Sequence, residues 1–551
     1  MNLVKSTIAI TIVFLFISLS FSLFSFSQTT IGDANANFND KNYDVALKQY
    51  LRLIRKDKNN EMMKYRIGIC YLNTDKDKAE AVKYLEKFAS PDYVGKRKYL
   101  DISVYYDLAK AYLHAHEFDK ALRKAEEFKK LARQDEKTDP SLIAEVERFK
   151  EVCNNARELI KSPLDVTFNC IGKNVNTARS EYNPFVAEDE SFLIYTSNKR
   201  YISDFQELVN SAYISKPSWG GNWGRGKSLG TKVNTDEDEI VVGVADEGNT
   251  VLLQLKRFDA WNDIYYTNKK GRSYRELQDF GKNVNSKEDE GGACLTPSGD
   301  TLFFASNRPL GYGGFDIYYS VKLPNGEWGI PQNAGPGINT PYDDNFPNLV
   351  DDGKTLYFAS KGYNSMGGYD IFITNKSDDG KWSAPKNIGY PLNDTYDNTI
   401  ITYTKNKRYA FISSVRKEGI GDRDIYKVIF NEVEKPNIVF RGYIAVGDSA
   451  TAKELSQVDP EITITVYNIT DINDEDFEDA EYTGKPLEDV FGEYSYIRSS
   501  GNYIISLPPG KYVLRVEGDF YKTFNYKINI LEKQPANSEI IKNIFLYPKT
   551  E

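Results

Sequence analysis

Hydrophobic and polar positions repeat with a period of roughly 54 residues between Ile171 and Phe430. Each unit begins with a segment related to Gly-x-x-Val-Asn, and its five copies are Ile171–Asn176, Leu229–Asn234, Phe280–Asn285, Ala334–Asn339 and Ile388–Asn393. An apolar run such as Leu302–Ser306 follows, and then a segment such as Asp316–Tyr319. Short β-branched and aromatic runs separated by turn residues indicate strands. A fixed repeat of this size is typical of a propeller, a solenoid or an array.

Four short antiparallel strands in each unit would make one blade of a propeller, and a ring of blades hides most sheet edges. The first repeat segment precedes the inner strand of its own unit, so the strand before it, Asp165 to Asn169, is expected to complete the last unit, which ends near Phe430. The sequence therefore predicts a five-bladed β-propeller over residues 163–432, closed by a strand from the N-terminal side.

The repeat resembles the TolB-like, WD-type propeller repeat. Its pattern of Asp-Gly-Lys-x-Leu, Asp-Ile-Tyr and Trp-x-x-Pro-x-Asn is nearly complete from Asp352 to Gly389, and Trp328–Pro331 matches its last part. The match covers about half of the chain. It implies a fold but no function, because propellers host many unrelated activities.

From residue 28 to residue 162 the apolar positions recur at helical spacing instead. The third unit is the clearest, with small and aromatic residues placed as on two packed helices: Leu108, Ala109, Tyr112, Phe118, Ala121, Ala125 and Phe128. This region resembles three degenerate tetratricopeptide repeats, followed by a capping helix from Pro140 to Ile160 with Asp139 as its N-cap. Such a stack presents a concave groove for peptides or helices. Alternatively, the helices pack on the propeller.

Residues 433–551 show a third pattern. The predicted strands are Ile438–Ile444, Ile462–Tyr467, Tyr494–Ile497, Tyr503–Leu507, Tyr512–Val516, Phe524–Ile530 and Ile540–Leu546. The stretch from Asn502 to Val516 is interpreted as a hairpin with Pro and Gly in its turn. The segment resembles the carboxypeptidase regulatory-like domain, which implies a noncatalytic, prealbumin-like β-sandwich.

Residues 1–27 are interpreted as a signal peptide, with Lys5 before a long apolar run and small residues at Ser25 and Ser27. An uncleaved membrane anchor is the alternative. The first cysteine is Cys70, so lipid anchoring at a processed N-terminus is not expected. A formal net charge of −9 gives no reason to expect nucleic-acid binding. The four cysteines suggest buried thiols or, alternatively, a bridge between Cys153 and Cys170.

Propellers also occur in hydrolases, so the presence or absence of catalytic motifs bears on the function. A serine hydrolase needs a general base beside its nucleophile, usually His, and the two histidines, His114 and His116, both lie in the helical region. The motifs Gly-x-Ser-x-Gly, His-Glu-x-x-His and the Walker loop do not occur. We therefore expect no enzyme and no cofactor. The two histidines suggest either a metal site or a solvated turn.

Carboxylates recur four and five residues after each repeat Asn. This set comprises Glu181, Asp238, Glu239, Asp289, Glu290, Asp343, Asp344 and Asp397. We expect them to ring one mouth of the propeller channel, where charges of one sign would focus the field on a cation or a basic peptide. The alternative is that each carboxylate accepts hydrogen bonds from the amides of its own turn.

The order of signal, tetratricopeptide stack, TolB-like propeller and regulatory-like sandwich resembles envelope proteins of Bacteroidetes, among them an OmpA-family subunit of the type IX secretion system. The OmpA-like domain and the lipidated Cys of those proteins are not found, so peptidoglycan binding and lipid anchoring are not expected. The resemblance implies an exported, noncatalytic scaffold of the periplasm or outer membrane, serving type IX secretion or gliding motility, with envelope proteins bound by the helical groove and the propeller faces. The alternative is a glycan- or ligand-binding protein that uses exposed aromatics: Trp219, Trp223, Tyr312 and Tyr363.

Overall fold

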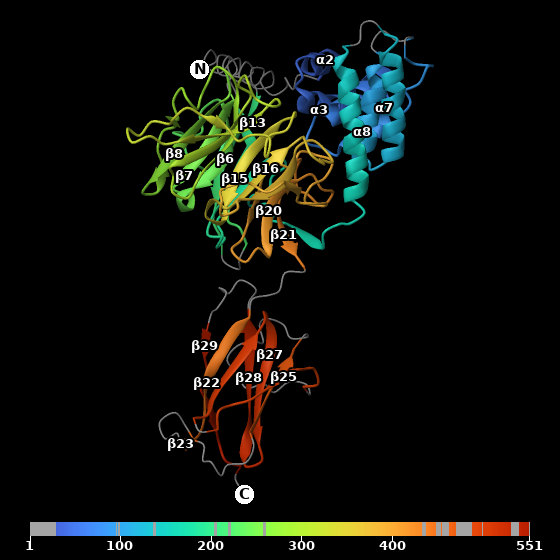
Figure 1. The fold of residues 1–551 in the computed structure, drawn as a ribbon. Coiled ribbons are helices and arrows are strands. Elements are labelled where there is room, and N and C mark those ends of the chain that lie inside the picture. The colour runs from blue at the N-terminus through green and yellow to red at the C-terminus, as the bar shows by residue number, and fades with distance from the viewer. Residues whose placement is uncertain are drawn as a thin grey trace, which may run out of the picture. The chain divides into compact units, whose positions relative to one another are not determined.

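The computed structural model describes residues 29–94, 96, 100–135, 139–202, 207–218, 222–256, 261–431, 437–447, 453–454, 462–469, 487–498, 500–530 and 539–549. The predicted signal peptide lies outside these residues. The chain divides into two compact units, one comprising Met1–Thr402 with Ala410–Val428 and the other Tyr403–Tyr409 with Ile429–Glu551. In the first unit, helices come first and strands follow, as the colours of Figure 1 show.

The described residues contain seven α-helices, here called the helical arm. They are α2 (Ile31–Asn39), α3 (Tyr43–Leu53), α4 (Glu61–Leu72), α5 (Ala81–Leu85), α6 (Ser103–His114), α7 (Phe118–Ala132) and α8 (Ser141–Leu159), with a short 3-10 helix, η1 (Lys78–Glu80). In α7 the buried residues Ala121, Ala125, Phe128 and Ala132 recur every three or four positions and form one apolar stripe. The predicted start of α8 is wrong by one residue, because Pro140 is the N-cap and the helix begins at Ser141; the Ser141 amide still donates to Asp139 Oδ1 over 2.9 Å.

Five sheets, each with a path of four hydrogen-bonded strands, follow the arm. The first contains β2 (Glu181–Val186), β3 (Leu193–Ile202), β4 (Glu207–Ser215) and β5 (Lys227–Ser228). The second contains β6 (Asp238–Ala245), β7 (Thr250–Lys256), β8 (Asp263–Lys270) and β10 (Gln278–Asp279), with β9 (Ser273–Tyr274) beside β8. The third contains β11 (Glu290–Leu295), β12 (Thr301–Ser306), β13 (Asp316–Val321) and β14 (Gln332–Asn333).

The fourth sheet contains β15 (Asp344–Val350), β16 (Thr355–Ser360), β17 (Asp370–Asn375) and β18 (Lys386–Asn387). The fifth contains β19 (Ile401–Tyr403), β20 (Tyr409–Ser414), β21 (Asp424–Phe430) and β1 (Val166–Cys170). The strand predicted over Asp165 to Asn169 is thus confirmed as β1, which pairs with β21 in the last sheet. This series of four-stranded sheets is consistent with a propeller-like domain.

The repeat segment joins neighbouring sheets through its Asn. Asn339, which lies before β15, accepts from the Ile317 amide of β13 over 2.8 Å and donates to the Ile317 carbonyl over 2.9 Å. The other repeat asparagines bond to the third strand of the preceding sheet in the same way: Asn176, Asn234, Asn285 and Asn393. Gly335 has a φ of 83°, and a Cβ there would meet nothing within 4 Å, so backbone conformation rather than space favours glycine.

The second unit has two sheets around one core. β22 (Ile438–Val446) pairs with β23 (Lys453–Glu454) and β26 (Asn502–Leu507), and runs parallel to β29 (Glu539–Ile541) and β30 (Ile544–Leu546). The other sheet has the order β25 (Val490–Tyr494), β24 (Ile462–Asn468), β27 (Gly510–Gly518) and β28 (Tyr521–Ile530). Buried residues of both sheets pack together, among them Phe440, Ile505, Ile464 and Leu514.

Two sequence predictions for this unit are wrong. The stretch from Asn502 to Val516 is not a hairpin, because β26 pairs with β22 whereas β27 pairs with β24 and β28. Pro508 and Pro509 lack amide hydrogens, and here the chain crosses from one sheet to the other instead of folding back on itself. The strand predicted at Tyr494–Ile497 lies earlier, at Val490–Tyr494, because these residues pair with β24.

The thiols of Cys70, Cys153, Cys170 and Cys294 are free, so the alternative of a bridge between Cys153 and Cys170 is wrong. Among the described residues, no helix combines the length and the apolar character needed to cross a bilayer.

Candidate functional site

The helical arm packs against connections between the strands, and Met366 takes part in that contact. Met366 lies between β16 and β17, yet its side chain is 0% exposed because it joins the apolar core of the helices. Tyr390, from another connection of the same sheet region, packs against this core as well. The interpretation that the helices pack on the strand region is therefore confirmed.

One face of α8 holds the loop that carries Met366, residues 361–369. The Arg148 guanidinium donates to the carbonyls of Lys361 and Gly362 over 2.5 and 3.0 Å, and to Ser365 Oγ over 2.9 Å. Asn155, two turns further along α8, donates to the Ser365 carbonyl over 3.0 Å. A charged donor that satisfies several loop carbonyls fixes the loop against the helix.

A second contact involves the connection between β20 and β21. Asp75 of the arm accepts from Arg423 over 2.8 Å and from Ser180 Oγ over 3.0 Å. Lys76 pairs with the neighbouring Asp422. Since these pairs are partly buried, they are screened less by solvent than surface pairs would be.

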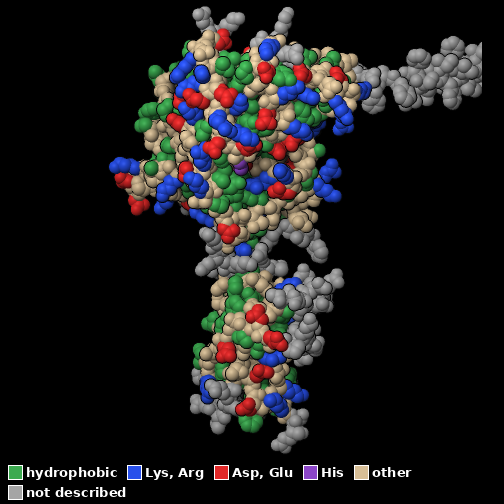
Figure 2. All heavy atoms as spheres, turned by 90° about the vertical axis from the view of Figure 1, so that its right-hand side faces the viewer, with side chains coloured by type: hydrophobic (Ala, Val, Ile, Leu, Met, Phe, Trp, Pro, Cys, Tyr) green, Lys and Arg blue, Asp and Glu red, His purple; other side chains and the backbone are tan. Residues whose placement is uncertain are grey.

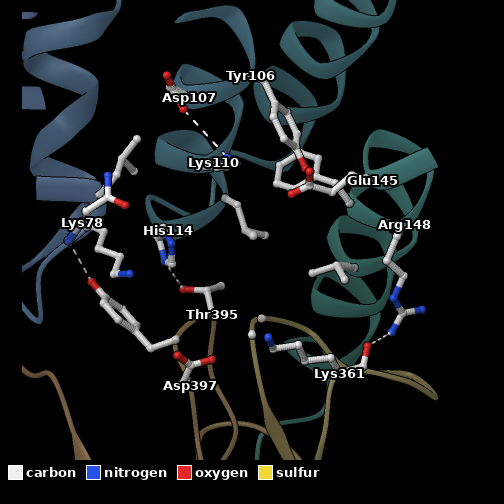
Figure 3. A pocket seen from close by; sticks show the side chains of 18 of the residues that line it. Lys78, Tyr106, Asp107, Lys110, His114, Glu145, Arg148, Lys361, Thr395 and Asp397 are labelled. Atoms are coloured by element: carbon white, nitrogen blue, oxygen red, sulfur yellow. Dashed lines mark hydrogen bonds and ion pairs between the residues drawn. The ribbon is translucent and has the colours of Figure 1, made fainter. Parts of the chain in front are cut away.

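Between these two contacts the arm and the strand connections line an open pocket of about 640 Å³, here called the cavity (Figure 3). Helices η1, α6 and α8 supply one wall, and the connections around residues 342, 361–368 and 395–397 supply the other. The polar lining residues are Asn73, Lys78, Tyr106, Asp107, Lys110, His114, Glu145, Arg148, Tyr342, Lys361, Thr395, Tyr396 and Asp397. Charges of both signs are also interspersed over the face of the molecule that Figure 2 shows.

Burial in the cavity walls changes the acidity of several groups. It raises the pKa of Asp107 to about 6, although the Lys110 ammonium lies only 3.8 Å away and acts in the opposite direction. Burial also lowers the pKa of Lys78, against the opposing effect of Asp397. The cavity therefore presents poorly solvated charges of both signs, which a complementary ligand could pair.

His114 lies in this cavity. Its Nδ1 is 3.1 Å from Thr395 Oγ1, its ring centroid is 4.8 Å from that of Tyr396, and burial lowers its pKa to about 3. The solvated turn predicted for both histidines thus holds for the exposed His116 but is wrong for His114, because the end of α6 turns that ring toward the strands. In the described part of the chain, no three His, Cys, Asp or Glu side chains form a group able to hold a metal ion.

The first carboxylate of each predicted pair bonds to the backbone of the preceding sheet. Asp238 accepts from the Asn210 amide, Asp289 from that of Asn262, Asp343 from that of Phe315 and Asp397 from that of Tyr369, over 2.6 to 3.0 Å. Asp343 additionally pairs with Lys361 over 2.9 Å. These four carboxylates therefore have a structural role, but they join the preceding repeat to their own and do not accept from the amides of their own turn, as the alternative had it.

The second carboxylate of each pair is buried and closes its own turn. Glu181, Glu239, Glu290 and Asp344 are 0% exposed, and each accepts from the backbone amide four residues earlier. Burial raises the pKa of Glu239 and of Asp344 to about 7. All eight residues thus have partners within the fold, and binding of a cation or a basic peptide at this mouth stays a prediction.

The aromatic residues expected in exposed blade loops differ in their surroundings. Tyr312 is exposed, as predicted. Trp223 is only 6% exposed because it packs against Phe411, so the prediction of an exposed platform there is wrong. Tyr363 is half-buried, since its hydroxyl donates to the Ile338 carbonyl over 2.6 Å. Trp219 lies outside the described residues.

Sequence reasoning missed the residues that join the arm to the strands. Arg148, Val152 and Asn155 recur at helical spacing along α8, which is a detectable polar and apolar face. Met366 stands where the neighbouring repeats have Tyr312 and Ile420, so its burial has no local signal.

No protein-family model and no curated protein matches the chain. Among solved structures, it is similar to TolB from Acinetobacter baumannii at 14% identity and a TM-score of 0.29, over 46% of this chain and 55% of that chain. It is similar to a putative TolB from Agrobacterium tumefaciens at 16% identity and a TM-score of 0.27, over 47% and 76%. It is also similar to Trypanosoma rangeli sialidase at 9% identity and a TM-score of 0.31, over 66% of this chain and 89% of that chain. These likenesses assign neither a family nor a function.

Proposed function

We propose that this protein is a noncatalytic, exported scaffold that binds other proteins in the cell envelope, in the periplasm or at the outer membrane. The observation that carries the proposal is the cavity between the helical arm and the strand connections. Its walls come from both parts of one unit, and its charges and tyrosines suit an extended peptide segment with side chains of both signs.

We infer a finer architecture for the same chain. The helices would be three tetratricopeptide repeats and a capping helix, the five sheets the blades of a closed propeller, and the second unit a prealbumin-like sandwich. The bonds of Asn176 to Ile425 of β21 support closure, because the first repeat segment attaches to the last sheet as each other segment does to its predecessor. The same order of modules supports a role in type IX secretion or gliding motility.

The arm would act as one part of the binding surface and not as a free groove. Met366 and the Arg148 bonds cover part of the face of α6 and α8, and the cavity is what remains open beside them. A partner segment there would contact helix and strand connections together. Fixing the arm in place reduces the conformational entropy lost on binding.

The test uses the full-length protein in crosslinked envelopes. Lys110→Glu reverses a charge in the cavity, whereas Lys120→Glu reverses one on α7, outside it. We expect Lys110→Glu to reduce copurification of envelope proteins at least tenfold and Lys120→Glu to leave it unchanged. Equal copurification by both variants would contradict the proposal.

A glycan or another small ligand is the second candidate. The rings of Tyr106, Tyr342 and Tyr396 line the cavity and offer stacking surfaces. Retention of the purified chain on a glycan array, lost on Tyr342→Ala and without any copurifying protein, would favour this function over the scaffold.

A further inference from the structure

The connection that carries Met366 has a counterpart one repeat earlier. Both loops are bounded by a Ser and an Asp that pair across neighbouring strands. The 361–369 loop begins after Ser360 and ends before Asp370, which pair with each other across β16 and β17. The 307–315 loop begins after Ser306 and ends before Asp316, which pair across β12 and β13. The loops therefore have the same length and the same register, and Tyr312 corresponds to Met366.

An equivalent Asp carboxylate accepts a hydrogen bond from the tip of each loop. Asp370 Oδ2 accepts from the Met366 amide over 3.0 Å, and Asp316 Oδ2 accepts from the Tyr312 amide over 2.6 Å. The next residue is also a glycine in both loops, and a Cβ on Gly367 or Gly313 would lie within 2.5 Å of the backbone of the segment that leads into the following sheet. The backbone therefore holds residue 312 in the same position relative to its sheet as residue 366.

The two tips differ in what covers them. Met366 is 0% exposed within the helical arm, whereas Tyr312 is 51% exposed and Leu310 beside it is 99% exposed. Leu310 also has a φ of 72°, a left-handed conformation that is strained for a leucine. A bulky apolar residue held outward under that strain points to a function for this loop.

The exposed loop continues the contact that the arm makes. Tyr342 approaches the 307–315 loop through its carbonyl, which would lie 2.0 Å from a Cβ on Gly313. The ring of the same Tyr342 lies 4.4 Å from the Arg148 guanidinium of α8 and lines the cavity. A helix placed on the 307–315 loop would therefore border α8 directly.

We propose that the 307–315 loop is a docking site for an amphipathic helix of a partner protein. The Met366 contact specifies the chemistry of that helix. The partner helix provides apolar side chains around Leu310 and Tyr312, as the helical arm does around Met366. It also provides an Arg or Lys that donates to the carbonyls of residues 307–309, as Arg148 does to those of residues 361–363.

The experiment places the photocrosslinker benzoylphenylalanine at position 310 of the full-length chain in cells of its source. A second chain carries it at position 330, where Ile330 is 82% exposed but lies after β13 and outside the loop. We expect position 310 to link to a segment of another protein that is helical, apolar on one face and basic beside that face. Tyr312→Ser should lower this yield at least tenfold, and position 330 should not give the product.

Products from position 310 that contain only this chain, a lipid, a glycan or an extended segment would overturn the proposal, as would the same product from position 330. Since Leu310 and Tyr312 are exposed, Tyr312→Ser is expected to unfold at the wild-type temperature, and that measurement accompanies the crosslinking. The inference rests on the proposed interaction function but not on the cavity. Lys110→Glu distinguishes a failure of the cavity proposal from a failure of the loop proposal, because it should leave the crosslinked product at position 310 intact.

Discussion

The 361–369 and 307–315 loops are bounded by equivalent residues of the repeat, but one tip is buried and the other is exposed. Both span nine residues between a paired Ser and Asp, and in both the Asp accepts from the amide at the tip. One tip is in the core of the helices and the other is in solvent. The repeat thus determines how a loop is shaped, and the element packed on it determines whether its tip stabilises the fold or is free to bind.

The largest difference is expected when each tip is shortened. Met366→Ala should lower the free energy of unfolding by about 2–4 kcal/mol, because it leaves a cavity in the core of the helices. Tyr312→Ala should change it by about 0.5 kcal/mol or less, since the ring is exposed. Urea denaturation of the full-length variants measures both, and similar losses would show that the tips are not in different environments.

The next effect concerns the bonds that hold the buried loop. Arg148→Ala should cost about 1.5–3 kcal/mol, because it removes a charged donor from three loop carbonyls and Ser365. Arg157→Ala on the same helix is the matched control, since Arg157 pairs with Asp119 at the surface and should contribute about 0.5 kcal/mol or less. A loss for Arg157→Ala as large as that for Arg148→Ala would refute the assigned role of Arg148.

A smaller effect depends on pH. The pKa of His114 falls from 6.5 in the unfolded chain to about 3 in the fold, so between these values the unfolded chain binds the proton more strongly. Stability should therefore decrease as pH falls from about 6.5 toward 3, by up to about 1.4 kcal/mol per pH unit from this group. His114→Asn should flatten that dependence, measured by thermal unfolding at several pH values, more than His116→Asn does. An unchanged slope in His114→Asn would contradict the burial of this ring.

The smallest effect tests the backbone of the exposed loop. Leu310→Gly removes the left-handed leucine and should change stability by about 0 to +1 kcal/mol, since relief of strain offsets the added flexibility of glycine. Ile330→Gly, at an exposed position outside the loop, should instead lose about 0.5–1 kcal/mol, because glycine adds conformational freedom to the unfolded chain. A larger loss for Leu310→Gly than for Ile330→Gly would mean that the leucine stabilises the fold.

The sequence contained enough to predict the sheets and the strand that completes the last of them. The Gly-x-x-Val-Asn segment carries a backbone requirement at Gly335 and a bonding requirement at Asn339, and both act locally, so every copy can be recognised. The sheet crossover after Leu507 was not predicted, because Pro and Gly end a strand whether the chain folds back or leaves the sheet.

The candidate site was predicted less well. Spacing brought the paired carboxylates to equivalent places, but it could not show that Glu239 is buried and bonded to Thr235 within its turn. Likewise, Met366, Tyr312 and Ile420 occupy one repeat position, and nothing in the repeat says which of them meets the arm. Such contacts depend on packing between distant parts of the chain.

The most direct test of the central claim, that equivalent loops serve one internal and one external contact, is photocrosslinking from positions 366 and 312 of the intact chain. We predict that position 366 links to the helical arm of the same molecule and position 312 to a helix of another protein. A product between molecules from position 366, or only internal products from position 312, would contradict the account.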